Sequence, residues 1–321
     1  MLEIAIRSGD DLGLQVLLGA GASRRKALGP SGTRLLQLAI ERGHTRIAER
    51  LLGEGVDPNP AERLLGEGGN LSVSASFGFV DIRWETPLHA ATGLCNASIV
   101  GSLLKAGVEV DRLAPRTALA AAVANGDLES TSLLLEAGAD VNMTQITDEG
   151  IGRNSRTPIQ AAANRGDLDL VKELHARGAD LNAPAGHSFE RTALQAACAS
   201  EVLNMELVRY LLGNGADVNA TAGPVGGLTA LQGAAICGHT RLVLLLLKDD
   251  IGADVNGKPA IHKGRTALEG AAEHGRLDLV QILLNAGAKP REGDDGYYRA
   301  IQFAEKEAHW VVVRLLRQAF V

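Results

Sequence analysis

The stretch RTALEGAAEHGRLDLVQILLNAGA, residues 265–288, decides the fold of this chain. The hydroxyl of Thr266 suits the cap of a first helix, and Gly275 suits the left-handed residue that ends it. Apolar residues recur at helical spacing on both sides of that glycine. They are Leu268, Ala271 and Ala272 in the first half, and Leu277, Val280, Leu283 and Leu284 in the second. Two helices this short cannot bury their apolar stripes alone, so the unit requires similar neighbours.

Such neighbours occur along most of the chain. First halves recur as ETPLHAA (85–91), RTALAAA (116–122), RTPIQAA (156–162), RTALQAA (191–197) and LTALQGA (228–234). Second halves end as LLLEAGADVN (133–142), ELHARGADLN (173–182), YLLGNGADVN (210–219) and GADVN (252–256). Over nearly its whole length the chain resembles the ankyrin-repeat family. The resemblance implies an all-α repeat solenoid, built of stacked helix-turn-helix ankyrin repeats with short hairpin fingers.

The fixed internal period predicts a single array over residues 1–321, with eight or nine units. They are expected near 1–22, 33–59, 86–111, 117–142, 157–182, 192–219, 229–256, 266–288 and 299–321. The last unit has Ala308 where a glycine is expected, and it lacks the GADVN ending. This departure is typical of a capping unit, which has a partner on one side only.

A long insert at 60–85 interrupts the period. Its residues 61–68, AERLLGEG, repeat residues 48–55, which indicates a local duplication. Beyond them an alternation of apolar and small residues predicts an extended hairpin finger. The finger carries Phe77 and Phe79, and Trp84 lies at its end. Two interpretations are open: the rings pack on neighbouring units as a lid, or they contact a partner directly.

Composition excludes several classes of function. Hydrophobic residues form 45% of the chain, while 32 basic against 38 acidic residues give a net charge of −6. Nucleic acid is not an expected partner, because phosphate contacts need clustered Lys and Arg, and no long basic run occurs. A membrane is not expected either, because an apolar run such as Leu242–Leu247 is too short to span a bilayer and Met1 begins no signal peptide.

The three cysteines predict no metal site and no disulfide framework. Cys95, Cys198 and Cys237 lie far apart without paired ligand spacing, and only Cys95 and Cys237 are expected to be accessible. Such sparse usage fits a reducing, intracellular compartment, and cytoplasm is the predicted location, with the nucleus as an open alternative. No cofactor is expected, because phosphate-binding glycine loops and the HExxH and GxSxG motifs are missing from the sequence.

Polar residues that stand three positions after the threonine in most first halves are interpreted as structural. His89 of TPLH is followed in later units by Gln160, Gln195, Gln232 and Glu269. Such side chains can hydrogen-bond neighbouring loops, so no catalytic residue is assigned here.

Binding residues are expected where the units differ from one another. The pair before the inter-helix glycine varies without a packing reason, and the family resemblance implies that it faces a concave groove. The predicted binding residues at these positions are Asn125, Asn164, Arg165 and His274. The finger residues predicted to join them are Trp84, Arg153, His187 and Phe189.

The resemblance implies a non-catalytic protein–protein interaction module, or scaffold, that binds a partner protein or peptide through the groove and fingers. Fold alone does not establish function, so an alternative stays open. The alternative is an enzyme or small-molecule-binding protein, whose pocket is built from the long fingers at 60–85, 143–156, 183–191 and 257–265. A deep pocket ringed by these fingers favours the alternative, whereas an open groove favours the interaction module.

Overall fold

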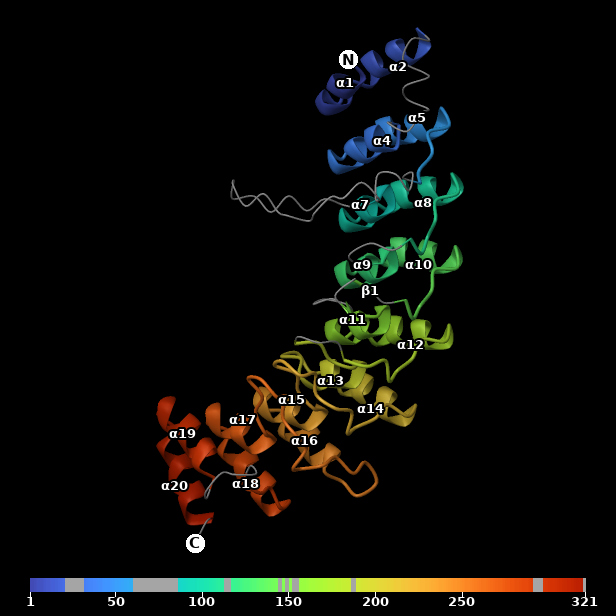
Figure 1. Ribbon diagram of the computed structural model, residues 1–321. Helices are drawn as coiled ribbons and strands as arrows, with labels where there is room; N and C mark the ends of the chain where they lie inside the picture. Colours follow the sequence, from blue (N-terminus) through green and yellow to red (C-terminus); the bar gives the residue numbers. More distant parts are fainter. Residues whose placement is uncertain are drawn as a thin grey trace. The chain divides into compact units, whose positions relative to one another are not determined.

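The computed structural model describes residues 1–20, 32–59, 86–112, 117–143, 146–147, 150–151, 156–185, 189–290 and 297–319. The chain divides into two compact units, unit 1 (residues 1–145) and unit 2 (residues 146–321). Each unit is an all-α repeat solenoid, in which short antiparallel helices are stacked as pairs (Figure 1). The predicted fold class is confirmed, whereas the repeat count and the single array stay predictions.

Unit 1 is made of helix pairs in which each second helix packs against its own first helix. The pairs are α1 (Leu2–Ser8) with α2 (Asp11–Gly19), α4 (Gly32–Glu41) with α5 (Thr45–Gly53), α7 (Pro87–Gly93) with α8 (Ala97–Lys105), and α9 (Ala118–Asn125) with α10 (Leu128–Glu136). First helices pack on neighbouring first helices, and second helices pack on second helices. The result is two helical layers.

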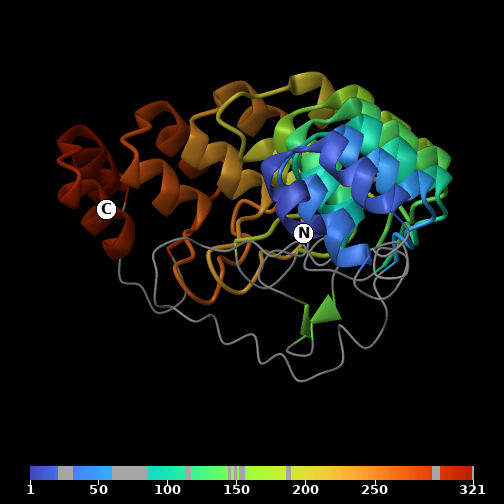
Figure 2. The ribbon, with the colours of Figure 1, turned by 90° about the horizontal axis from the view of Figure 1, so that it is seen from above.

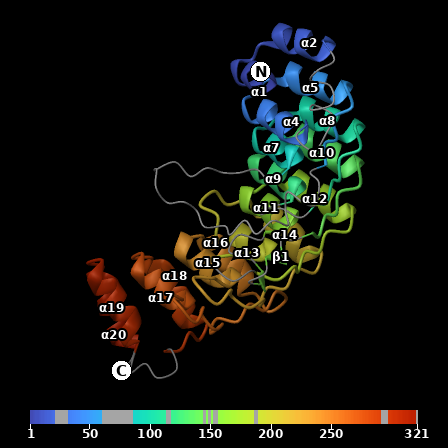
Figure 3. The same cartoon turned by 45° about the horizontal axis from the view of Figure 1, so that its top comes forward.

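Unit 2 opens with two antiparallel strands, β1 (Ile146–Thr147) and β2 (Gly150–Ile151), in which Ile146 pairs with Ile151. Its helix pairs are α11 (Pro158–Arg165) with α12 (Leu168–Ala176), α13 (Ala193–Cys198) with α14 (Met205–Gly213), α15 (Ala230–Cys237) with α16 (Thr240–Leu246), α17 (Ala267–Glu273) with α18 (Leu277–Asn285), and α19 (Tyr298–Lys306) with α20 (Trp310–Ala319). The last two pairs lie side by side (Figure 3). The loops that precede α15 and α17 extend away from the helix pairs, and both lie on the same side of the unit (Figure 2).

First helices begin where the sequence predicts. The side chain of Thr266 accepts a hydrogen bond from the backbone N–H of Glu269, and Glu269 in turn accepts one from the backbone N–H of Thr266. This reciprocal capping box satisfies two donors that the first turn leaves without partners. Thr157, Thr192 and Thr229 begin their helices in the same way with a glutamine as the second residue of the box.

A left-handed residue separates the two helices of most pairs. Gly126 and Gly275 have φ angles of +75° and +66°, which glycine adopts without a steric penalty. Cys95 and Ala308 occupy the corresponding positions with φ angles of +53° and +60°. The pair α7/α8 and the last pair therefore keep the turn geometry with a strained, non-glycine residue.

Small residues let the first helices approach one another closely. A Cβ atom built on Gly270 of α17 would lie 2.5 Å from Cγ1 of Ile236, so Ile236 of α15 packs directly on the glycine backbone. Branched side chains supply the rest of the core between layers, as Leu134 of α10 does with no exposed surface. The scarcity of aromatic residues follows from this spacing, since thin layers leave no room for large rings.

Amide side chains join successive fingers, as predicted for the glutamine positions. Gln160 Nε2 donates to the carbonyl oxygen of Ala183 at 2.9 Å, and Gln195 and Gln232 make equivalent bonds. Farther out, Asn182 donates to the carbonyl oxygen of Gly215 at 3.0 Å and accepts from the backbone N–H of Asp217 at 2.8 Å. These bonds fix each finger relative to the next one in unit 2.

The 60–85 insert, with Phe77, Phe79 and Trp84, lies outside the described residues. Its lid and contact interpretations therefore both stay hypotheses. Within the described part of the chain, no helix combines the length and apolar character needed to cross a bilayer.

Candidate partner-binding surface

Asn125 is the predicted site residue of unit 1 that the structure describes. It is the last residue of α9, its side chain is exposed, and its Nδ2 donates to the carbonyl oxygen of Thr92 at 3.2 Å. The bond links the end of α9 to α7, the preceding first helix. Asn125 thus has a structural contact and an exposed side chain.

In unit 2, the predicted groove residues lie at the ends of first helices. Asn164 and Arg165 are the last two residues of α11, and both are exposed. His274 directly follows α17 and is exposed, with its Nδ1 3.0 Å from the carbonyl oxygen of Gly270. Trp84, Arg153 and His187 lie outside the described residues, so their assignment to the site stays a prediction.

Three successive fingers of unit 2 share an unusual backbone conformation. Phe189, Gly226 and Lys263 stand three residues before Thr192, Thr229 and Thr266, and their φ angles are +55°, +64° and +58°. Backbone hydrogen bonds tie these fingers together. Phe189 N–H donates to Val225 O at 2.8 Å, Gly226 N–H to His262 O at 2.9 Å, and His262 N–H to Pro224 O at 3.0 Å.

This arrangement builds an exposed aromatic and cationic surface. A Cβ atom on Gly226 would lie 2.2 Å from Cε1 of Phe189, so the phenyl ring rests directly on the glycine. Lys263 Nζ lies 5.9 Å from the centroid of the same ring, within cation–π range. Phe189 is 53% exposed and Ile261 is 75% exposed. We call Phe189, Gly226, Ile261 and Lys263 the finger platform.

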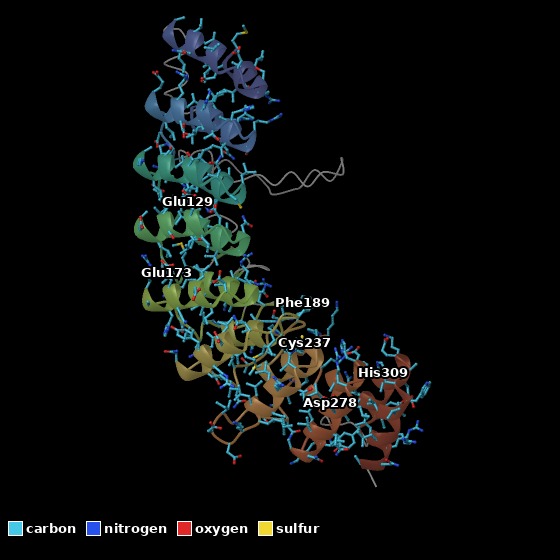
Figure 4. All side chains as sticks on the ribbon, turned by 180° about the vertical axis from the view of Figure 1, so that it is seen from behind. Glu129, Glu173, Phe189, Cys237, Asp278 and His309 are labelled. Atoms are coloured by element: carbon cyan, nitrogen blue, oxygen red, sulfur yellow. The ribbon has the colours of Figure 1, made fainter. Side chains whose placement is uncertain are left out.

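Phe189 of the finger platform lies on the first-helix side of unit 2, and Glu173 of α12 lies on the opposite side of the unit (Figure 4). Phe189 was predicted from the sequence, whereas Lys263 and Ile261 were not. Lys263 could have been found from its position in the repeat, because Phe189 and Lys263 both stand three residues before a capping threonine.

Arginines precede three of the capping threonines of unit 2, at Arg156, Arg191 and Arg265. Arg265 is fully partnered: its Nε is 2.8 Å from Oε2 of Glu273, and its guanidinium carbon lies 3.9 Å from the ring centroid of Phe303. Arg191 differs, because its Nε is buried without a hydrogen-bond acceptor among the described residues. Sequence analysis did not assign these arginines to the site.

The two cysteines of unit 2 are poorly suited to nucleophilic chemistry. Cys198 is buried and Cys237 is partly exposed, as predicted, and burial raises the pKa of both thiols. A raised pKa leaves little thiolate at neutral pH, and the thiolate is the reactive form. Cys237 instead directs its Sγ to the carbonyl oxygen of Ala199, at 3.5 Å.

Comparison with known families agrees with the geometry. The family described as ankyrin repeats (3 copies) matches residues 57–145, 145–222 and 199–294, which together cover most of the chain. A comparison with curated proteins gives no match. Because the match covers most of the chain, the chain belongs to the ankyrin-repeat family.

Proposed function

We propose that this chain is a non-catalytic interaction module that binds a protein or peptide partner. Ankyrin repeats are generally modules for protein–protein interaction. The proposed contact surface is the finger platform of unit 2 together with Asn164, Arg165 and His274. Asn125 of unit 1 and the predicted residues Trp84, Arg153 and His187 are proposed as further contacts.

The proposal depends mainly on Phe189, whose ring is exposed although its backbone is in a left-handed conformation. A left-handed backbone costs a non-glycine residue about 1–2 kcal/mol. Phe189 nevertheless adopts it, with φ +55° and a ring that is 53% exposed. Because neither the backbone strain nor the exposed ring favours folding, a role in binding accounts for both.

The chemistry of the finger platform suits a protein partner. Aromatic rings serve as anchors in protein interfaces, because they bury a large area with few rotatable bonds. Gly226 supports one face of the Phe189 ring, and Lys263 adds a positive charge beside it. An apolar residue next to an acidic residue on the partner fits this combination of ring and charge.

The test compares two exposed apolar residues on opposite layers of unit 2. Phe189 on the finger is 53% exposed, and Leu244 on α16 is 50% exposed. The immobilised full chain and its Phe189→Ser and Leu244→Ser variants are each incubated with native extract, and bound proteins are quantified by mass spectrometry. Circular dichroism checks that each variant keeps its helical content.

We expect the same partner with the unchanged chain and Leu244→Ser, and about 30-fold weaker binding with Phe189→Ser, since loss of an aromatic anchor costs about 2 kcal/mol. Equal recovery by all three proteins argues against the finger platform. A co-purifying small molecule that depends on Phe189, with no protein partner, supports the ligand-binding alternative instead.

A further inference from the structure

The arginines that precede the capping threonines of unit 2 occupy equivalent places in different repeats. Arg156, Arg191 and Arg265 each stand one residue before Thr157, Thr192 and Thr266, which cap α11, α13 and α17. α11 and α13 pack against each other, so Arg156 and Arg191 belong to adjacent fingers. The same backbone position therefore presents a guanidinium repeatedly along one side of the unit.

In the repeat that contains Arg265, the arginine at this position binds a carboxylate of the same repeat. Arg265 Nε lies 2.8 Å from Oε2 of Glu273, and Arg265 Nη2 lies 3.1 Å from Oε1 of the same carboxylate. Two parallel hydrogen bonds of this kind match the planar guanidinium to the planar carboxylate. Glu273 stands seven residues after the capping threonine of its repeat.

The repeats of Arg191 and Arg156 lack this carboxylate. Seven residues after Thr192 the chain has Ala199, and seven residues after Thr157 it has Asn164. No ion pair among the described residues includes Arg191 or Arg156, whereas Arg265 has one. The buried Nε of Arg191 has a hydrogen to donate and no acceptor among the described residues.

The electrostatic surroundings agree with a missing anion. Burial and the nearby charge of Arg156 lower the pKa of the Arg191 guanidinium, and among the described groups only the Cys237 thiol acts in the opposite sense. Arginine stays charged at neutral pH even so. A positive charge is therefore held in a partly buried place beside a second positive charge, with no ion pair to Arg191 among the described residues.

We propose that Arg191, assisted by Arg156, binds a carboxylate of the partner, as Arg265 binds the carboxylate of Glu273, but through its terminal nitrogens. The carboxylate belongs to an aspartate or glutamate side chain, or to a chain terminus. Arg191 donates its terminal N–H groups to the two oxygens, because protein atoms cover its Nε, and Arg156 adds a second positive charge nearby. This inference rests on the proposed function, because it takes the carboxylate to belong to the protein or peptide partner.

The direct test observes the Arg191 Nε–H group by nuclear magnetic resonance in the full chain with labelled arginine. Acetate is the probe, and sodium chloride at equal ionic strength controls for screening. Arg209 of α14 is the internal reference, because it is exposed on a second helix of the same unit. We expect a saturable shift of the Arg191 signal with acetate and no saturable shift at Arg209.

Two substitutions at one position distinguish charge from bulk. Ala199→Glu places a carboxylate where Glu273 stands in the later repeat, so it should occupy Arg191 and weaken acetate binding at least tenfold. Ala199→Gln has nearly the same size without the charge and should leave acetate binding within about twofold. Arg209→Gln should leave the response of the Arg191 signal to acetate unchanged. A charge-assisted hydrogen bond accounts for effects of roughly tenfold or more.

Several results overturn the inference. These are an Arg191 signal that acetate does not shift, equal shifts at Arg191 and Arg209, or equal effects of Ala199→Glu and Ala199→Gln. Stronger binding of inorganic phosphate than of acetate overturns the assignment to a carboxylate. The function has a separate readout, because loss of the partner with Phe189→Ser alone supports the interaction module even if Arg191 binds no carboxylate.

Discussion

The helix pairs α1/α2 and α9/α10 of unit 1 follow one pattern and differ in burial. Aligned on Gly9 and Gly126, Ile4 corresponds to Ala121 and Val16 corresponds to Leu133. Ile4 and Val16 are 64% and 71% exposed, whereas Ala121 is 6% exposed. In α9/α10 these positions face the preceding pair, as Leu133 does with its Cδ1 3.7 Å from the Cβ position of Gly101 in α8.

The difference shows that a repeat is buried mainly by its neighbours. Each pair provides its own turn and its own apolar stripe, yet the outer side of that stripe is buried only where another pair covers it. Unit 1 should therefore have a gradient of local stability, from α1/α2 to the interior pairs.

Leu134→Ala and Leu17→Ala are the matched pair for the core. Leu134 has no exposed surface, whereas Leu17, at the aligned position of α2, is partly exposed. Leu134→Ala should lower the free energy of unfolding by about 2–5 kcal/mol, because a buried cavity remains. Leu17→Ala should cost less than half as much, because α1/α2 can fray separately.

Urea denaturation followed by circular dichroism measures the first effect, and amide hydrogen exchange of α1 and α2 measures the second. Equal shifts of the denaturation midpoint for the two variants are incompatible with the gradient. Similar exchange protection in α2 and α10 contradicts it as well.

The N-terminal helix caps of α9 and α1 also differ, and we expect them to make a smaller difference in stability between the same two pairs. Thr117 Oγ1 accepts from the backbone N–H of Ala120 at 3.1 Å, whereas Met1 caps α1 without a side-chain hydrogen bond. Thr117→Ala should therefore cost about 1 kcal/mol. Met1→Leu, a change at a position without such a bond, is the control and should leave the midpoint unchanged. If Thr117→Ala leaves the denaturation midpoint unchanged, the helix cap does not contribute to the stability gradient.

Much of the fold could be predicted from sequence because its signals are local. A threonine cap, a left-handed glycine and a helical apolar stripe each act within a few residues, and the structure confirms each in the stretch around Thr266 and Gly275. The repeated glutamines were also predictable, since each bonds the adjacent finger. The number of repeats, their boundaries and the 60–85 insert stay predictions.

The candidate surface was harder to predict because it depends on contacts between repeats. Phe189, Gly226 and Lys263 share a backbone conformation, yet they are three different residue types and form no motif. The missing acceptor of Arg191 is visible only beside the ion pair of Arg265 and Glu273. Variation between repeats selected Asn164 and Arg165, which the structure shows as exposed, and their role in binding stays a prediction.

The smallest predicted effect concerns a strained turn. Cys95 joins α7 to α8 with φ +53°, where Gly126 joins α9 to α10 with φ +75°. Cys95→Gly should relieve about 1–2 kcal/mol of backbone strain and lose about 0.5–1 kcal/mol to the greater freedom of the unfolded chain. The expected net gain is about 0.5 kcal/mol.

Ala106→Gly is the matched control, because Ala106 ends α8 with φ −80° and has no strain of this kind to relieve. It should lower stability by about 0.5–1 kcal/mol through unfolded-state entropy alone. Opposite signs for the two glycine substitutions identify the left-handed turn as the cause. If both substitutions destabilise the chain equally, Cys95 is not strained, and the turn between α7 and α8 contributes nothing to the differences among the repeats.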